Sequence, residues 1–170
     1  MFRKKGSVIN CARKNLKNFL ESDYNLAQEK NDFPNDAVKK IVLSENEIDT
    51  LSPYAFFTFT KLRSLNLDHN NLSDLPIELS QLTSLKKLNI SFNAFNAIPT
   101  SVLELTQLQS LNVQNNRIYS VPDEIKTLKQ LTSLNVQHNR LTKLPNSLTE
   151  LSLSKLKVVG NPLVRPPMLM

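Results

Sequence analysis

Glycine, cysteine and tryptophan are scarce in this chain, whose 170 residues include two glycines, one cysteine and no tryptophan. Phosphate-binding loops need two or three glycines within about eight residues, so nucleotide chemistry built on such loops is excluded. The single cysteine, Cys11, cannot form an internal disulfide or one of the usual cysteine frameworks for zinc. A lone cysteine mildly favours a reducing compartment.

Long apolar runs are also missing. No stretch approaches the roughly 18 apolar residues of a membrane span. Asn10, Arg13 and Lys14 interrupt the N-terminal stretch before it could form the hydrophobic region of a signal peptide, and Phe2 stands where a myristoylation signal needs glycine. We therefore predict a cytoplasmic protein. Export by a specialised secretion system would leave no such signal and stays open.

Leucine and asparagine are in excess, at 29 and 20 residues. Charged residues make up 21% of the chain and hydrophobic residues 40%, which is the composition of a globular protein. A chain of this length can bury a core of its own, so one structural domain is expected. The paired leucine and asparagine bias indicates an internal repeat.

The pattern L-x-x-L-x-L-x-x-N-x-L-x-x-L-P recurs at steps of 23 residues, with conservative apolar replacements. A weaker copy precedes the complete ones, from Val38 to Leu51, and a shortened copy follows them, from Leu153 to Leu163. The complete copies start at Leu62, Leu85, Leu108 and Leu131.

These copies resemble leucine-rich repeats, specifically the intracellular 23-residue class that carries "LP" in each repeat and is typified by Ras-pathway scaffolds. The resemblance covers residues 38–163 and implies an α/β solenoid. In that fold a curved parallel β-sheet forms the concave face, and short helical or irregular return segments form the convex face. The resemblance also implies a protein ligand on the concave face, with small-GTPase or kinase pathway components as partners.

The repeat pattern has a physical reason. Side chains alternate along a strand, so Leu65 and Leu67 face one core while Asn66 faces the opposite side. Each repeat thus supplies one short strand, and the apolar residues of the return segment, such as Leu79 and Leu82, cover the other side of that core.

The flanking segments complete the domain plan. Residues 1–37 are predicted to hold a basic arm, an opening half-repeat with a strand from Ile9 to Cys11, and an enlarged loop with a helical turn around residues 24–28. Residues 38–163 hold about six repeats, partial ones included, and residues 164–170 form a Pro-rich tail. We expect this tail to fold over the last repeat, with an oligomer contact as the alternative.

One asparagine per repeat stands where the strand turns away. Its carboxamide offers two donors and two acceptors, so it can satisfy backbone groups of the turn, and stacked copies can bond to one another as a ladder. The positions of this structural ladder are Asn46, Asn70, Asn93, Asn116, Asn139 and Asn161.

Reactive groups are few. Cys11 occupies an inward slot and is interpreted as a small buried hydrophobe. His69 and His138 occupy the same slot three repeats apart, at a distance of about 14 Å, so they cannot share a metal. No acid pair recurs at catalytic spacing. We predict no enzymatic activity, no metal and no cofactor.

The outward slots of the strands predict the binding surface. They are almost wholly neutral and polar, with Phe92 near the middle, and an aromatic with a polar surround is typical of a protein-binding hot spot. Alternatively, Phe92 only covers its neighbours. The predicted ligand-binding residues are His69, Phe92, Asn115, His138, Asn89, Asn112, Gln114, Gln137 and Asp68.

Charge is unevenly placed along the chain. Residues 1–17 carry six basic residues and no acid, whereas the rest carries 15 basic and 15 acidic residues, so the net charge of +6 belongs to the N-terminus. A gradient is also expected along the concave face. Its acidic end holds Glu45, Glu47 and Asp68. Its basic end holds Arg117, Arg140, Lys155 and Lys157.

The function predicted from the sequence is a non-enzymatic adaptor or scaffold in signalling, with a protein ligand of unknown identity. Two alternatives stay open: a pathogen effector or surface protein that binds a host protein, and a nucleic-acid or anionic-membrane binder acting through residues 1–17. Nucleic acid and membrane are not the expected partners, because no stacking aromatics or groove-reading helix accompany the basic residues. A monomer is expected.

Overall fold

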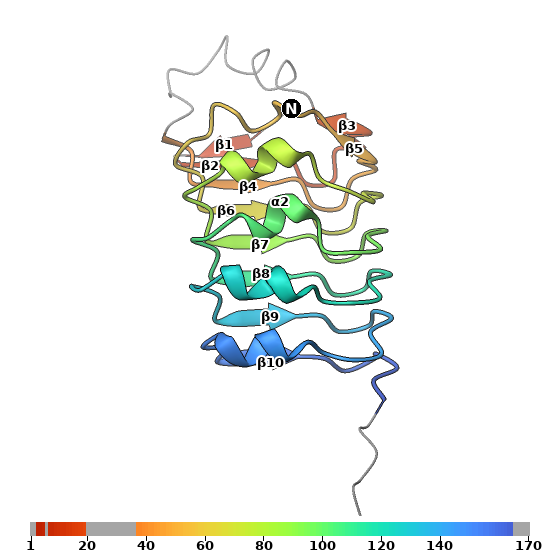
Figure 1. Ribbon diagram of the computed structural model, residues 1–170. Helices are drawn as coiled ribbons and strands as arrows, with labels where there is room; N and C mark the ends of the chain where they lie inside the picture. Colours follow the sequence, from red (N-terminus) through yellow and green to blue (C-terminus); the bar gives the residue numbers. More distant parts are fainter. Residues whose placement is uncertain (1–2, 6, 20–36, 165–170) are drawn as a thin grey trace, which may run out of the picture.

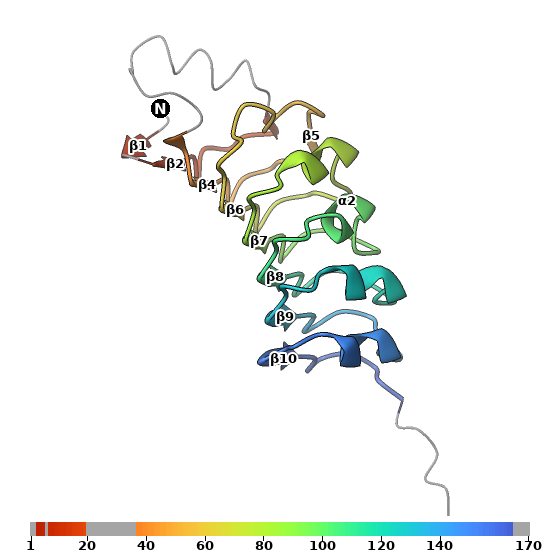
Figure 2. The same cartoon turned by 60° about the vertical axis from the view of Figure 1, so that its left-hand side comes forward.

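The computed structural model describes residues 3–5, 7–19 and 37–164. Their strands form one eight-stranded sheet in the order β1-β2-β4-β6-β7-β8-β9-β10, which lines the concave side of a bent stack (Figures 1 and 2). The predicted α/β solenoid is confirmed. The strands are β1 (Arg3–Lys5), β2 (Val8–Asn10), β4 (Lys40–Val42), β6 (Ser64–Asn66), β7 (Lys87–Asn89), β8 (Ser110–Asn112), β9 (Ser133–Asn135) and β10 (Lys155–Lys157).

The central residue of each interior strand points into the core. Leu65 pairs with Leu88 in parallel register, Leu88 with Leu111, and Leu111 with Leu134, and all four side chains are buried. Because successive side chains point to opposite faces, the flanking residues of each strand lie on the concave surface. The 23-residue step thus keeps these four repeats in register with one another.

The N-terminal end of the sheet differs from the interior repeats. Strand β2 begins at Val8 and pairs in parallel with β4, while β1 pairs with β2 antiparallel and forms the edge. The repeat pattern predicts no strand at Arg3–Lys5, because this segment has no leucine register to follow. A second, two-stranded sheet joins β3 (Asn18–Phe19) and β5 (Thr50–Leu51) in parallel.

Short helices follow the proline of each complete repeat and lie on the side opposite the sheet (Figure 2). Proline presets φ near that of a helix and lacks the N–H that the first helical turn leaves unbonded. Each helix buries at least one side chain against the core. These helices are η2 (Ile77–Gln81), α2 (Thr100–Leu103), η3 (Asp123–Thr127) and η4 (Asn146–Glu150), of which only α2 is α-helical.

The apolar core runs without interruption from Ile9 to Leu151. Phe19 and Phe56 stack in its N-terminal part, with ring centroids 5.6 Å apart, and Phe95 fills a leucine slot in the middle. The predicted helical turn at residues 24–28 and the predicted fold-over of residues 165–170 lie outside the described residues.

The recurring asparagine bonds to the backbone of two repeats at once. In Asn93, the Oδ1 atom accepts from the N–H of Leu72 in the preceding repeat at 2.9 Å, and Nδ2 donates to Leu67 O of that repeat at 3.0 Å. Nδ2 also lies 3.2 Å from Ile90 O and 3.0 Å from Ser91 O in its own repeat. The same pattern recurs at five other positions: Oδ1 accepts from an N–H of the preceding repeat, and Nδ2 donates to carbonyls of both repeats. These positions are Asn46, Asn70, Asn116, Asn139 and Asn161.

This arrangement differs from a ladder of carboxamides bonded to one another. Both ends of each carboxamide are engaged with backbone atoms, so the link between neighbouring asparagines passes through the main chain. The opening half-repeat has Lys14 in the asparagine position, and its N–H donates to Asn46 Oδ1 of the next repeat at 2.8 Å.

We expect Asn93→Leu to lower the free energy of unfolding by about 1 to 3 kcal/mol, because it leaves backbone groups of two repeats without partners. Urea denaturation measures this change. The matched control is Asn96→Leu, because Asn96 is exposed and its side chain bonds no described residue. Equal stability losses in the two variants would contradict the role assigned to the Asn93 carboxamide.

Candidate functional site

The concave face presents two columns of polar side chains, one on each side of the buried leucines. A shallow hollow of about 310 Å³ lies over strands β4 to β8 and is lined by residues of both columns. The inner column is Ser64, Lys87, Ser110 and Ser133, and the outer column is Asn66, Asn89, Asn112 and Asn135.

The outer column is held in place by hydrogen bonds. Each of its Oδ1 atoms accepts from the N–H two residues later, at 3.1 to 3.2 Å. Lateral bonds connect neighbouring strands, since Asn135 Nδ2 donates to Gln114 Oε1 at 2.8 Å and Asn112 Nδ2 donates to Ser91 Oγ at 3.4 Å. A ligand therefore meets side chains that are already ordered, which reduces the entropy lost on binding.

Beyond this column, a left-handed turn residue stands three positions after each strand of the eight-stranded sheet except β1, with φ between 51° and 56° in every non-glycine case. Only glycine and a few polar residues adopt this conformation at little cost, so the stacked turns fix the direction of the side chains they carry. We call this set the turn column. Its members are Arg13, Glu45, His69, Phe92, Asn115, His138 and Gly160.

Neighbouring members of the turn column contact one another. His69 and Phe92 stack with ring centroids 4.1 Å apart and planes 13° from parallel. His69 Nδ1 also lies 2.8 Å from Asp68 Oδ2, which gives the imidazole a second contact. Phe92 remains 40% exposed. Phe92 thus both covers a neighbour and presents apolar surface to solvent.

His138 does not join this group, because the Asn115 position separates it from Phe92. Its ring instead lies over Gly160, where an added Cβ would lie 2.3 Å from His138 Nδ1. Gly160 also has a φ of 78°, so both space and backbone conformation require glycine there. The structure therefore brings His69, Phe92 and Asp68 together and leaves His138 apart.

The acidic end of the expected charge gradient is partly neutralised. Arg13 Nε donates to Glu45 Oε2 at 2.7 Å, and Arg13 Nη2 donates to Glu45 Oε1 at 2.9 Å. The hydrogen bonds from this guanidinium lower the pKa of the Glu45 carboxyl. Asp68 is engaged by His69. One cation of the N-terminal segment thus offsets one acid of the first repeat.

The sequence reasoning missed the inner column of the concave face. Ser64, Lys87 and Ser110 line the hollow together with the asparagines, yet none was among the predicted binding residues. The sequence could have indicated this column, because Ser64 and Asn66 are two residues apart on one strand and must face the same side.

Ser91 is buried, and its hydroxyl donates to Asn89 Oδ1 at 2.7 Å. Ser91 therefore helps to hold an asparagine of the outer column in place.

The described residues offer little reactive chemistry. Cys11 is fully buried, and this burial raises the pKa of its thiol to about 12. No group of three or more histidine, cysteine or acidic side chains that could hold a metal occurs among residues 3–5, 7–19 and 37–164. In the same part of the chain, no helix is long and apolar enough to cross a membrane.

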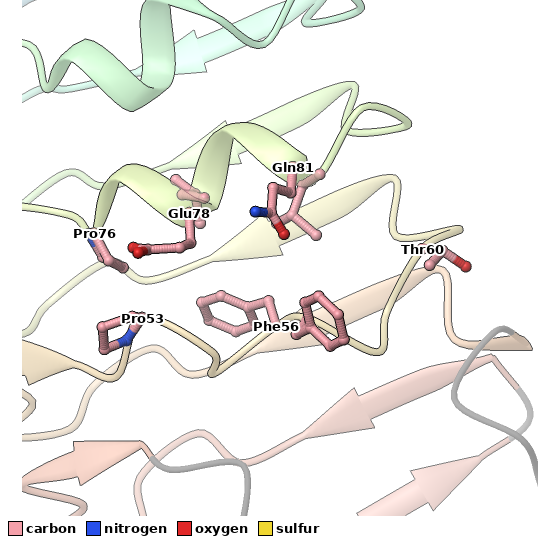
Figure 3. Close-up of a pocket in the computed structure, with 9 residues that line it drawn as sticks. Pro53, Phe56, Thr60, Pro76, Glu78 and Gln81 are labelled. Carbon is pink, nitrogen blue, oxygen red and sulfur yellow. The ribbon is translucent and has the colours of Figure 1, made fainter.

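One small pocket lies on the convex side, between residues 53–60 and η2 (Figure 3). It has a volume of about 20 Å³, far below the roughly 300 to 1,000 Å³ of typical small-molecule sites. A hollow of about 500 Å³ also lies between residues 120–123 and 143–146, so volume does not select the site. The concave face is the better candidate because its polar side chains are joined by hydrogen bonds and lie beside an exposed aromatic ring.

Comparison with known proteins agrees with this geometry. The sequence matches the leucine rich repeat family over residues 36–101 and 106–163. This chain belongs to that family, whose members generally mediate protein-protein interaction and are typically not enzymes. A comparison with curated proteins gave no match.

Several solved structures share the fold. A leucine-rich repeat protein of Leptospira interrogans is 32% identical, with a TM-score of 0.74, over 77% of this chain and 34% of that one. An internalin from Listeria monocytogenes is 27% identical, with a TM-score of 0.66, over 76% of this chain and 37% of that one. The ectodomain of an Arabidopsis thaliana membrane receptor kinase, in complex with Casparian strip integrity factor 2, is 26% identical, with a TM-score of 0.64, over 75% of this chain and 16% of that one. The chain thus spans about a third of the first two relatives and less of the third.

The burial of Cys11 has a measurable consequence. At pH 8 the thiol stays protonated in the folded chain, because its pKa of about 12 lies well above that pH. We expect alkylation by iodoacetamide to be at least about a hundredfold slower in the native chain than in urea-unfolded chain, as followed by mass spectrometry. Alkylation at comparable rates in both states would show that the Cys11 slot is open.

Proposed function

We propose that this chain is a non-enzymatic adaptor or scaffold whose concave face binds a protein ligand, with the stacked His69 and Phe92 pair as the anchor. The observation that supports this most is that Phe92 is 40% exposed while it lies on a left-handed turn and stacks on the His69 imidazole, with ring centroids 4.1 Å apart. Hot spots favour aromatic side chains that are ordered before binding and surrounded by polar groups.

The surrounding amides support a protein ligand in particular. The Oδ1 atoms of Asn89 and Asn112 are engaged by their own backbone, and Asn115, Gln114 and Gln137 are half-buried beside them. Such a surface offers hydrogen bonds without strong charge, which suits the main chain and polar side chains of another protein. His138 lies at the margin of this ligand-binding surface.

We further propose that the chain belongs to the 23-residue "LP" class and has a cytoplasmic signalling role. Its support is the constant repeat step, the helix that follows each repeat proline and the single buried thiol, which suits a reducing compartment. Small-GTPase or kinase pathway components are the partners that this class would imply.

A second candidate is an effector or surface protein that binds a host protein. It is favoured by the likeness to leucine-rich repeat proteins of two bacteria, Leptospira interrogans and Listeria monocytogenes. Both candidates use the concave face. Binding through residues 1–17 is less supported, because Arg13 is already paired with Glu45.

Affinity capture from the native cell extract tests the proposal. We expect the variant His69→Ala/Phe92→Ala to capture at least about tenfold less of the partner protein than the unchanged chain does, because the apolar anchor is gone. Mass spectrometry quantifies the captured amounts.

The matched control is Tyr54→Ala/Tyr119→Ala. These aromatics are 59% and 53% exposed but lie outside the eight-stranded sheet. Circular dichroism checks that all variants are folded. Equal capture by both double variants and the unchanged chain would overturn the concave anchor, and loss only in the control would move the site to the convex side.

A further inference from the structure

Among the described residues, β10 is the last strand of the sheet and has a neighbour on one side only (Figure 1). In the preceding repeat, the N–H of Val136 donates to Lys157 O and the N–H of His138 donates to Val159 O, both at 2.9 Å. The register places Val158 and Gly160 in the equivalent positions one strand further along. Among the described residues no strand lies beyond β10, so these two N–H groups face outward without a backbone acceptor.

The core is also open at this edge. Leu156 is 42% exposed, whereas Leu134, its partner in β9, is completely buried. An added strand would place one of its own side chains over Leu156, as each strand of the sheet does for the one before it. The side chain that best fills this slot is apolar.

Charge defines what can lie beside that apolar residue. Lys155 and Lys157 flank Leu156, and both are exposed on the concave side. Their neighbours on β9, Ser133 and Asn135, are uncharged, and neither lysine forms an ion pair with a described residue. Directly opposed side chains of opposite charge stabilise strand pairs, and like charges destabilise them.

This charge pattern disfavours copies of the same chain. Antiparallel pairing of two β10 strands about Leu156 would set Lys155 opposite Lys157 twice. Stacking β10 on β1 of a second copy would bring it beside Arg3–Lys5, which is also basic. The sequence of residues 165–170 is no better suited, because it adds Arg165 and two prolines, which have no N–H to donate.

We propose that the β10 edge accepts an extended acidic segment of another protein as the next strand of the sheet. The segment alternates acidic with apolar residues, so that carboxylates meet Lys155 and Lys157 while an apolar side chain covers Leu156. The N–H groups of Val158 and Gly160 donate to its carbonyls. This mode of strand addition draws affinity from main-chain hydrogen bonds and specificity from alternate side chains. It uses a different surface from the His69 and Phe92 anchor.

The probe is a fluorescein-labelled synthetic peptide of alternating glutamate and valine, titrated with the full chain by fluorescence anisotropy. We expect saturable binding that weakens at least about tenfold in Lys155→Glu/Lys157→Glu. The matched control is Lys17→Glu/Lys39→Glu, which makes the same charge change at two exposed lysines at the opposite end of the stack from β10 and outside the hollow of the concave face. The control should keep its affinity within about threefold, and circular dichroism verifies that both variants fold.

Amide hydrogen exchange locates the peptide. We expect exchange at Val158 and Gly160 to slow at least about tenfold when the peptide binds. Equal weakening in both lysine variants would overturn the proposal in favour of general charge attraction. Protection of these amides in the free chain would also overturn it, pointing to a second copy if the protection rises with protein concentration and to residues 165–170 if it does not.

Discussion

The structure depends on the bonds that each recurring asparagine makes between two repeats. A few residues after each three-residue strand the chain turns sharply, and backbone carbonyls there, such as those of Leu67 and Ile90, bond to asparagine side chains. The Asn93 carboxamide replaces the missing partners on both sides of the junction. Leucines supply the apolar core, but a core alone does not determine where the chain turns. The asparagines determine where the chain turns, and therefore which residues become the left-handed members of the turn column.

The proposed function depends on this constraint, because the turn column carries the side chains that directly precede the recurring asparagines in the sequence. Phe92 precedes Asn93 directly, so the bonds of Asn93 position the aromatic ring that a ligand would meet. Structural residues and proposed binding residues therefore share one turn. A change at the asparagine acts on stability, whereas a change at the turn residue acts on the surface.

Much of this organisation could be predicted from the sequence. The spacing of Leu65, Leu67 and Asn70 contains the strand period, the repeat step and the turn, so the solenoid and its polar concave face follow from them. The contacts that could not be predicted from the sequence are those between side chains of different repeats. The Arg13–Glu45 pair spans 32 positions, and the stack of His69 on Phe92 depends on both turns being left-handed. The strand β1 was missed because antiparallel pairing at an edge leaves no repeat signature.

The central claim is that the concave turn column around Phe92 forms the binding surface. The most direct measurement is a hydrogen-exchange footprint of the chain in complex with its captured protein partner. The account predicts slower exchange in the strands and turns of residues 64–69, 87–92 and 110–115, with the helices η2 and η3 unchanged. Slower exchange confined to the helices and return segments would place the ligand on the convex side and contradict the account.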